Sequence, residues 1–291
     1  MPTITIIGPG AIGGTVAAWL AQDGANSVSI CARTPFDELR VDTPLGCLLV
    51  VPRLFTSPDH VVEPSDWVMV ATKAYDVAGA ASWFPGLIAP HTRVAILQNG
   101  VEHIERFAPY MNTDKIVPVV VELPAERTAP GYIRQKSDGH LVAPDNDNGS
   151  DFVRLFTHTA LTATTTADFR SRAWRKLALN CTGVVSALLL RPVDIRENEE
   201  IADLMRVLIR ECIIVGRAEG AQLDDSLEEE IIEGYRKHPP QGINSIHADR
   251  LAGRKLEIDA RNGAVVRIGE KHGIDTPMNR LMVTQLKAAG S

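Results

Sequence analysis

The sequence predicts an α/β protein in two parts, an N-terminal half that alternates strands and helices and an all-α C-terminal half. Short apolar runs typical of buried strands recur as far as residue 166, whereas beyond residue 167 apolar side chains recur at the three- and four-residue steps of a helix. The chain also begins with an apolar run, residues 4–7, that leads straight into a glycine-rich turn. We therefore expect two domains, residues 1–166 and residues 167–291.

The glycine-rich turn has the sequence Gly8-Pro9-Gly10-Ala11-Ile12-Gly13, which matches G-x-G-x-x-G. Because a strand precedes it and a helix over residues 15–22 follows, the helix N-terminus would point toward a bound pyrophosphate. The first glycine makes the turn, the second admits the pyrophosphate and the third lets helix and strand pack closely. Pro9 has no N–H, so the other amides must bind the phosphates. We predict a Rossmann-type dinucleotide-binding domain with cofactor contacts at Gly8, Gly10, Ala11, Ile12 and Gly13.

The second strand, predicted over residues 27–31, ends close to Arg33. In dinucleotide-binding folds an acidic residue about 20 positions after the glycines binds the ribose 2′-hydroxyl of NAD, whereas an Arg there suits the 2′-phosphate of NADP. Arg33 lies at that distance, and the next acidic residues, Asp37 and Glu38, lie further on. We therefore predict NADP(H) as the cofactor; the alternative is that Arg33 is only a solvated charge at a strand end.

Three further strands are predicted over residues 48–51, 66–71 and 94–97, and the first two are apolar on both faces, as central parallel strands are. Lys73 and Asn99 follow the last two strands. Since ligands bind outside the carboxyl ends of strands in open α/β sheets, both are candidate site residues. The alternatives are an exposed charge for Lys73 and a simple turn former for Asn99.

The rest of the N-terminal half has weaker signals. Residues 74–84 have a helical pattern, and short extended pieces between residues 116 and 143 indicate an antiparallel edge to the sheet. A last helix is expected over residues 151–160 and a last strand over residues 161–166.

Candidate chemistry lies on the helices of the C-terminal half. These are predicted over residues 174–190, 199–219, 226–235 and 245–272, with a last helix opened by Thr276-Pro277. Lys176 and Asn180 are four residues apart and share a helix face. Ser245 and Asp249 have the same spacing, and Glu257 would lie near their side two turns later.

These side chains fit the reduction of a ketone. A hydride added to a carbonyl carbon leaves negative charge on the oxygen, which needs a proton donor, and we expect Lys176 to be that donor. Glu257 could orient the donor or accept a hydrogen bond from a substrate hydroxyl, and Ser245 could bind a substrate carboxylate. Spacing alone leaves open that these residues are only solvated faces or ion pairs.

Composition excludes several classes of protein. The net charge of −6, with no Lys/Arg block among aromatic residues, argues against a nucleic-acid binder, and no apolar stretch is long enough to cross a membrane. Cys31, Cys47, Cys181 and Cys212 are scattered, which predicts reduced thiols and no metal site. Because the first strand begins at Thr3, we expect no targeting peptide and a cytoplasmic location. A small molecule is the expected ligand.

The sequence resembles the ketopantoate reductases (2-dehydropantoate 2-reductases) over nearly its whole length. In the N-terminal half the resemblance is carried by the glycine-rich turn, by Thr72-Lys73-Ala74 and by Leu97-Gln98-Asn99-Gly100. In the C-terminal half it is carried by Trp174-Arg175-Lys176-Leu177-Ala178-Leu179-Asn180, Ser245-Ile246-His247-Ala248-Asp249 and Glu257-Ile258-Asp259-Ala260-Arg261-Asn262-Gly263.

The resemblance implies NADPH-dependent reduction of a 2-keto acid, namely ketopantoate to pantoate on the route to pantothenate, in a cleft between the two domains. It implies Lys176 as the general acid and Glu257 as its catalytic partner. The residues implied to bind or orient the substrate are Asn99, Asn180, Ser245 and Asp249, and those implied to contact the cofactor include Arg33, Lys73 and Asn99.

Two positions depart from the family. Members typically carry a second Asn four residues after the one matching Asn180, where this chain has Val184, and their hydroxyl-rich stretch is here Ile243-Asn244-Ser245-Ile246. These changes favour the alternative of a reductase for a different, less polar 2-keto acid. A second alternative is a catalytically inactive NADP(H)-binding sensor, against which Lys176 and Glu257 speak. Apolar helical faces in the second half fit either an internal core or a homodimer, and we expect a homodimer.

Overall fold

The computed structural model describes residues 1–22, 24–192, 194–195, 198–237 and 243–289. The chain divides into two compact units. Unit 1 comprises Met1–Gln98 and His103–Phe169, and unit 2 comprises Asn99–Glu102 and Arg170–Ser291. The division after Phe169 lies close to the domain boundary expected after residue 166. The short segment Asn99–Glu102, which belongs to unit 2, had no signal in the sequence.

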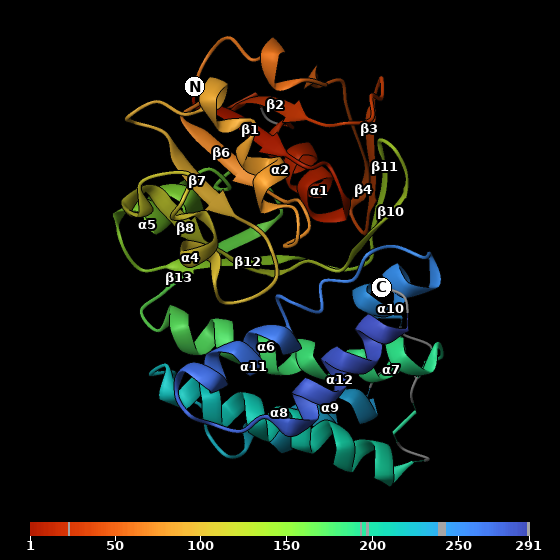
Figure 1. The fold of residues 1–291 in the computed structure, drawn as a ribbon. Coiled ribbons are helices and arrows are strands. Elements are labelled where there is room, and N and C mark those ends of the chain that lie inside the picture. Colours follow the sequence, from red (N-terminus) through yellow and green to blue (C-terminus); the bar gives the residue numbers. More distant parts are fainter. Residues whose placement is uncertain (23, 193, 196–197, 238–242, 290–291) are drawn as a thin grey trace. The chain divides into compact units, whose positions relative to one another are not determined.

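Unit 1 is built on a six-stranded parallel sheet with the strand order β5-β2-β1-β6-β7-β8 (Figure 1). The strands are β1 (Thr3–Ile7), β2 (Ser27–Cys31), β5 (Arg53–Phe55), β6 (Trp67–Val70), β7 (Arg93–Ile96) and β8 (Ile116–Pro118). The order reverses between β1 and β6, which makes the carboxyl ends of these two strands the switch point where doubly wound sheets bind ligands. The predicted Rossmann-type α/β fold is confirmed.

Two smaller sheets complete the strands of unit 1. One has the order β10-β11-β3-β4, with β3 (Leu39–Thr43), β4 (Gly46–Val50), β10 (Ala125–Ala129) and β11 (Tyr132–Gln135). The other has the order β13-β12-β9, with β9 (Val120–Glu122), β12 (His140–Pro144) and β13 (Thr162–Thr166). The strands between residues 116 and 143 therefore belong to three different sheets, and the expectation that they form one antiparallel edge was wrong.

The strand expected over residues 48–51 was also assigned wrongly. It is β4, which pairs antiparallel with β3 and leaves Leu49 58% exposed, so it is no central parallel strand. Its apolar run mimics a buried strand because one face packs on the core, where Leu48 and Val50 contact buried residues of unit 1.

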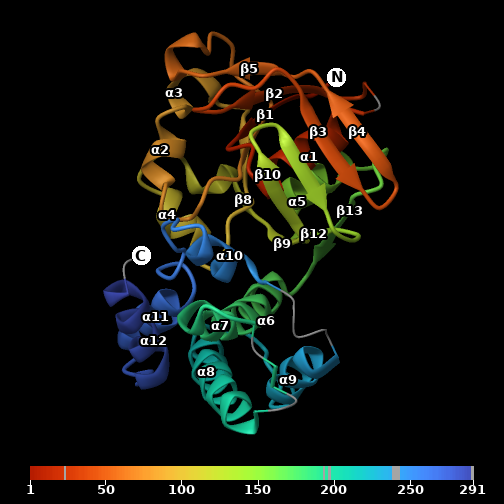
Figure 2. The same cartoon turned by 90° about the vertical axis from the view of Figure 1, so that its right-hand side faces the viewer.

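Helix α1 (Ala11–Leu20) begins inside the glycine-rich turn, four residues before the predicted start, and lies between the large sheet and the sheet that contains β3 and β11 (Figure 2). The other helices of unit 1 are short. They are α2 (Val77–Ala81), α3 (Phe84–Leu87), α4 (His103–Phe107) and α5 (Asp147–Arg154), with 3-10 turns η1 (Pro58–His60) and η2 (Thr113–Lys115). The single helix predicted over residues 74–84 is thus two helices, and α5 starts before the predicted residue 151.

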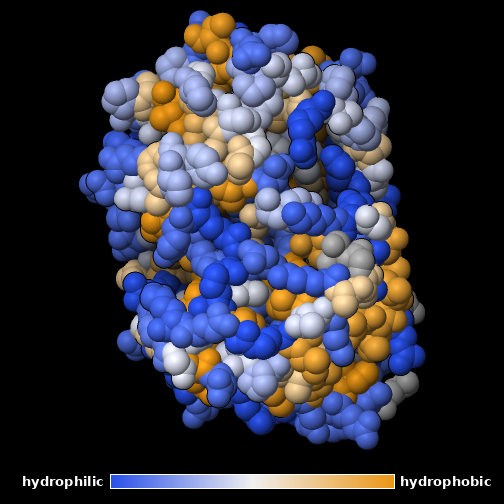
Figure 3. Space-filling view, in the orientation of Figure 1, coloured by the Kyte–Doolittle hydropathy of each residue, from blue (hydrophilic) through white to orange (hydrophobic). Residues whose placement is uncertain are grey.

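The described part of unit 2 is helical, as predicted, and packs around the apolar face of the long helix α8 (Glu199–Ala218). The other helices are α6 (Phe169–Thr182), α7 (Val184–Leu189), α9 (Leu227–Lys237), α10 (Ser245–Leu251), α11 (Asn262–Lys271) and α12 (Pro277–Ala288). No helix in the described ranges is long and apolar enough to cross a membrane. Figure 3 shows hydrophobic side chains at the surface of unit 2, and Leu189 and Leu190 at the end of α7 are 41% and 49% exposed.

Two helix predictions in this unit were wrong. The helix expected over residues 174–190 breaks at Gly183, whose carbonyl accepts a hydrogen bond from the Asn244 amide at 3.1 Å. The helix expected over residues 245–272 stops at Leu251 and resumes only at Asn262. Gly253 takes a left-handed conformation (φ +63°), and the Asp249 carboxylate binds Arg254, so the chain turns back on α10.

Candidate functional site

The glycine-rich turn of unit 1 has the geometry of a phosphate cradle. Gly8 has φ +90°, and a Cβ there would lie 2.9 Å from Thr72 Cγ2. A Cβ on Gly13 would collide with the Gly8 carbonyl oxygen, so both positions require glycine. A Cβ on Gly10, in contrast, would meet no atom within 4 Å. The open space beside Gly10, at the N-terminus of α1, fits a pyrophosphate group.

The hydrogen bonds of the turn also show which amides can bind a phosphate. The Gly10 N–H donates to the Gly8 carbonyl at 2.8 Å and so closes the turn itself. Pro9 has no N–H. The first N–H groups of a helix have no partner within it, which leaves those of Ala11, Ile12 and Gly13 as donors. Pro9 therefore removes no donor that this turn would use.

Two predicted cofactor residues lie beyond the ends of β2 and β6, the strands on either side of β1. Arg33 follows β2, its side chain is 84% exposed, and its guanidinium lies 3.3 Å from the Asp76 carboxylate at the start of α2. Lys73 follows β6 and is half-buried. Gln98, which had no predicted role, donates through its amide to Thr72 Oγ1 at 3.0 Å and to the Lys73 carbonyl at 3.3 Å. Gln98 thereby fixes the loop that carries Lys73.

In unit 2, three of the predicted site residues form one line of hydrogen bonds. The Asn180 amide donates to Asn99 Oδ1 at 3.3 Å, and the Asn99 amide donates to Glu257 Oε2 at 3.2 Å. Glu257 is only 4% exposed, and both asparagines are half-buried. In the sequence, Asn99 lies 81 positions before Asn180 and 158 positions before Glu257.

The backbone around Asn99 is fixed from both sides. Gly100 has φ +114°, and a Cβ there would lie 3.0 Å from the Ala260 carbonyl oxygen. Glu102 makes two hydrogen bonds with the Arg267 guanidinium, at 2.9 and 2.7 Å. The interpretation of Asn99 as a turn former is thus partly right, because Gly100 does need its conformational freedom. The Asn99 side chain nevertheless bonds to two other candidate residues.

Lys176 lies on α6 one turn before Asn180, on the face that the spacing predicts. It is half-buried, and its neighbours Trp174 and Leu177 are buried in the core of unit 2. Val184, the position that departs from the family pattern, is fully buried in the same core.

Ser245, Asp249 and Glu257 do not share one helix, because α10 ends at Leu251. Asp249 is buried, and its carboxylate binds the Arg254 guanidinium at 2.8 Å. Ser245 is exposed, and its hydroxyl accepts a hydrogen bond from Arg261 Nη2 at 2.8 Å. The structure thus gives Asp249 an ion pair and Ser245 a cationic partner that sequence reasoning missed. The one feature of the sequence that could have indicated Arg261 as this partner is its position four residues after Glu257.

Asn262 and Asn279 form a separate buried network. The Asn262 amide donates to the Cys181 carbonyl at 3.1 Å and to Asn279 Oδ1 at 2.8 Å. The Glu211 carboxylate accepts three hydrogen bonds, from the backbone N–H of Met278 and from the N–H and amide of Asn279. All three side chains are buried, so this network holds α6, α8, α11 and α12 together rather than binding a ligand.

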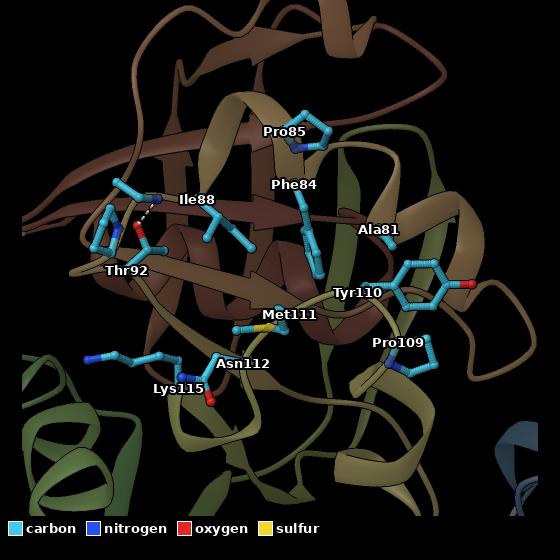
Figure 4. A pocket seen from close by; sticks show the side chains of 12 residues that line it. Ala81, Phe84, Pro85, Ile88, Thr92, Pro109, Tyr110, Met111, Asn112 and Lys115 are labelled. Atoms are coloured by element: carbon cyan, nitrogen blue, oxygen red, sulfur yellow. Dashed lines mark hydrogen bonds between the residues drawn. The ribbon is translucent and has the colours of Figure 1, made fainter.

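A surface pocket of about 740 Å³ lies in unit 1, at α3 and the segment after α4 (Figure 4). Phe84 and Ile88 form part of its apolar lining, and Lys115 and Asn112 lie at one side. None of the predicted site residues lines this pocket. The glycine cradle of unit 1 and the hydrogen-bonded line of unit 2 are therefore separate candidates from this pocket.

A glycine cradle at the switch point of a parallel sheet, followed by a helical unit, is typical of Rossmann-type dinucleotide-binding proteins. Comparison with known proteins gives the family. The family model "Ketopantoate reductase PanE/ApbA" matches residues 4–148, and the model of the C-terminal part of the same family matches residues 168–290. The chain belongs to the ketopantoate reductase family and is an oxidoreductase.

The similar proteins span the whole chain. It is 50% identical over 289 residues to a 2-dehydropantoate 2-reductase of Caulobacter vibrioides, which covers 99% of both chains. It is 36% identical over 287 residues to a 2-dehydropantoate 2-reductase of Mycobacterium tuberculosis, which covers 98% of this chain and 97% of that one. A crystal structure of a PanE/ApbA family ketopantoate reductase from Ralstonia eutropha JMP134 superposes with a TM-score of 0.89 at 28% identity, covering 98% of this chain and 97% of the other.

Proposed function

We propose that this chain reduces 2-dehydropantoate to pantoate with NADPH, a step that supplies pantoate for pantothenate. The full-length identity of 50% to a protein of that name supports the substrate. The observation that carries the chemistry is the hydrogen-bonded line of Asn180, Asn99 and Glu257, with Lys176 one turn away on α6.

In this proposal residues 1–166 form the NADP-binding domain and residues 167–291 form the substrate and catalytic domain. The open space beside Gly10 and the donors of Ala11, Ile12 and Gly13 would hold the pyrophosphate. Arg33 would bind the 2′-phosphate, because it is exposed and free to turn from Asp76 to a stronger anion. Lys73 would add a second positive charge. NADPH, when bound, supplies the hydride.

The residues of unit 2 would handle the proton and the substrate. As the keto carbon gains a hydride, the π electron pair of the carbonyl moves to oxygen, and the Lys176 ammonium gives its proton to that oxygen. The neutral amine of Lys176 then regains a proton from water. Glu257 would accept a hydrogen bond from the new hydroxyl, while Asn99 and Asn180 hold Glu257 and the substrate in place.

The test is to follow NADPH absorbance with purified protein and a panel of 2-keto acids that includes 2-dehydropantoate. Turnover that is fastest with 2-dehydropantoate is the expected result. Fastest turnover of a less polar 2-keto acid would support the alternative favoured by Val184. Tight NADPH binding with no turnover of any acid would instead indicate a sensor.

We also propose that the protein is a homodimer. Helices α7 and α10 contact each other and carry exposed Leu189, Leu190 and Leu251 near their ends, an apolar surface that a second copy could cover. Sedimentation at several protein concentrations tests this proposal, and a monomer at all of them would contradict it.

A further inference from the structure

Arg261 is a buried cation with no acidic partner. It lies at the start of α11 and is 2% exposed. Its Nη2 donates to the Ser245 hydroxyl at 2.8 Å, its Nε has no hydrogen-bond partner, and it makes no ion pair with any other described residue. Burying an unpaired charge costs several kcal/mol, so such a residue calls for an anion.

Most other arginines in the described ranges of unit 2 show what Arg261 lacks. Eight of them pair with a carboxylate, whereas Arg250 also has a buried Nε without a hydrogen-bond partner; the eight are Arg175, Arg206, Arg210, Arg217, Arg236, Arg254, Arg267 and Arg280. Arg267 and Arg210 each use the edge formed by Nε and Nη2 to bind both oxygens of one glutamate. On Arg261 the same edge holds only the Ser245 hydroxyl, and its Nε is free.

The position of Arg261 connects it with the candidate site. Glu257 precedes it by four residues, and Ala260, the residue before it, packs against Gly100 beside Asn99. Its partner Ser245 is exposed, so a small anion can reach this hydroxyl, and it must displace the hydroxyl from Nη2 to reach the buried edge of the guanidinium.

The proposed substrate also calls for such a residue. A 2-keto acid carries a carboxylate on the carbon next to its ketone. Arg254 pairs with Asp249, and Lys176 has the proposed role of proton donor, whereas Arg261 pairs with no carboxylate of a described residue.

We propose that Arg261, together with Ser245, binds the substrate carboxylate through its Nε and Nη2 edge and so makes the enzyme select keto acids over neutral ketones. This inference rests on the proposed function. Two parallel N–H···O bonds from a guanidinium match a carboxylate better than a single hydroxyl does, and an ammonium cannot reproduce them.

The test compares Arg261→Gln and Arg261→Lys with the wild type, using 2-dehydropantoate and its uncharged methyl ester as substrates. Arg280→Gln, which removes an arginine of a surface ion pair in the same unit, is the matched control. Loss of one partner of a buried charge pair costs about 2–5 kcal/mol, so KM for the acid should rise at least about 30-fold in Arg261→Gln. KM for the ester should stay unchanged, Arg261→Lys should be intermediate, and Arg280→Gln should match the wild type.

Equal losses for the acid and the ester, or an unchanged KM for the acid, would overturn the proposal. Thermal melting shows whether Arg261→Gln is folded, and if it is not, Arg261→Lys serves the same comparison. Calorimetric binding of 2-dehydropantoate separates the two proposals. If the wild type binds the acid without reducing it, the proposed function fails, whereas weaker binding to Arg261→Gln still supports Arg261. If the wild type does not bind the acid, both proposals fail.

Discussion

Gly100→Ala should reduce activity by moving Asn99, because Gly100 fixes the backbone from which that side chain extends. The residue has φ +114°, a conformation that costs a residue with a Cβ about 1–3 kcal/mol, and the new Cβ would lie 3.0 Å from the Ala260 carbonyl oxygen. Asn99 donates a hydrogen bond of 3.2 Å to Glu257 and accepts one of 3.3 Å from Asn180. They are already long, so a shift of a few tenths of an ångström weakens both.

The size of the effect follows from these two bonds. At about 0.5–1.5 kcal/mol each, their loss amounts to about 1–3 kcal/mol, or a 5- to 140-fold decrease in kcat/KM for the keto acid. Steady-state kinetics measure this decrease, and NADPH fluorescence measures separately how far the shift of Asn99, which is also an expected cofactor contact, weakens NADPH binding.

Gly273→Ala is the matched control. Gly273 also has a positive φ, +66°, but a Cβ there would meet no atom within 4 Å. This variant should melt at a lower temperature with normal kcat/KM. Wild-type activity in Gly100→Ala, or an equal loss of activity in Gly273→Ala, would refute the role given to the Asn99 backbone.

Three further predictions concern other parts of the chain. Arg33→Ala should raise KM for NADPH about tenfold and leave KM for NADH unchanged, since only NADPH has a 2′-phosphate; equal effects on both cofactors in steady-state assays would rule out that contact. Glu211→Ala leaves three donors of Met278 and Asn279, two of them buried, without their acceptor, so it should lower the free energy of unfolding in urea by about 3 kcal/mol, and a loss below about 1 kcal/mol would contradict the network. Burial lowers the pKa of His247 below 6.5, and the Leu190 carbonyl offsets part of this shift, although neither ring nitrogen has a partner in hydrogen-bonding geometry among the described residues. As the pH falls, the imidazole of His247 is therefore protonated in the unfolded chain before it is protonated in the folded one, and the free energy of unfolding decreases below pH 6.5. His247→Leu should therefore have a higher melting temperature than the wild type, by a difference that grows as the pH falls. A difference that does not change with pH would contradict this.

The nucleotide-binding half of the fold was predictable because its signals are local. The run from Thr3 to Gly13 contains a strand, a turn and a helix start in sequence, and the glycines are required by contacts made within a few residues or with the neighbouring strand. The exposed strand β4 was assigned wrongly because its partner β3 has a weak apolar pattern, and pairing between strands is not visible in the pattern of either one.

The geometry around the predicted site residues was not predictable from the sequence. Apolar spacing continues through residues 245–272, yet the left-handed Gly253 and the Asp249–Arg254 ion pair, which are local features that this spacing hides, end the helix at Leu251. Glu257 therefore reaches Asn99 from an irregular segment. Arg261 was missed because a buried, unpaired guanidinium has the same sequence signature as any surface arginine.

Whether Lys176 donates the proton is decided by the rate of NADPH oxidation in a single turnover with 2-dehydropantoate, compared between the wild type and Lys176→Ala. A positioned general acid contributes about 100- to 10,000-fold. We predict rapid oxidation by the wild type, and a rate at least about 100-fold lower in Lys176→Ala with unchanged NADPH binding. A wild-type rate in Lys176→Ala would contradict the role of Lys176, and no oxidation by the wild type would contradict the proposed reaction itself.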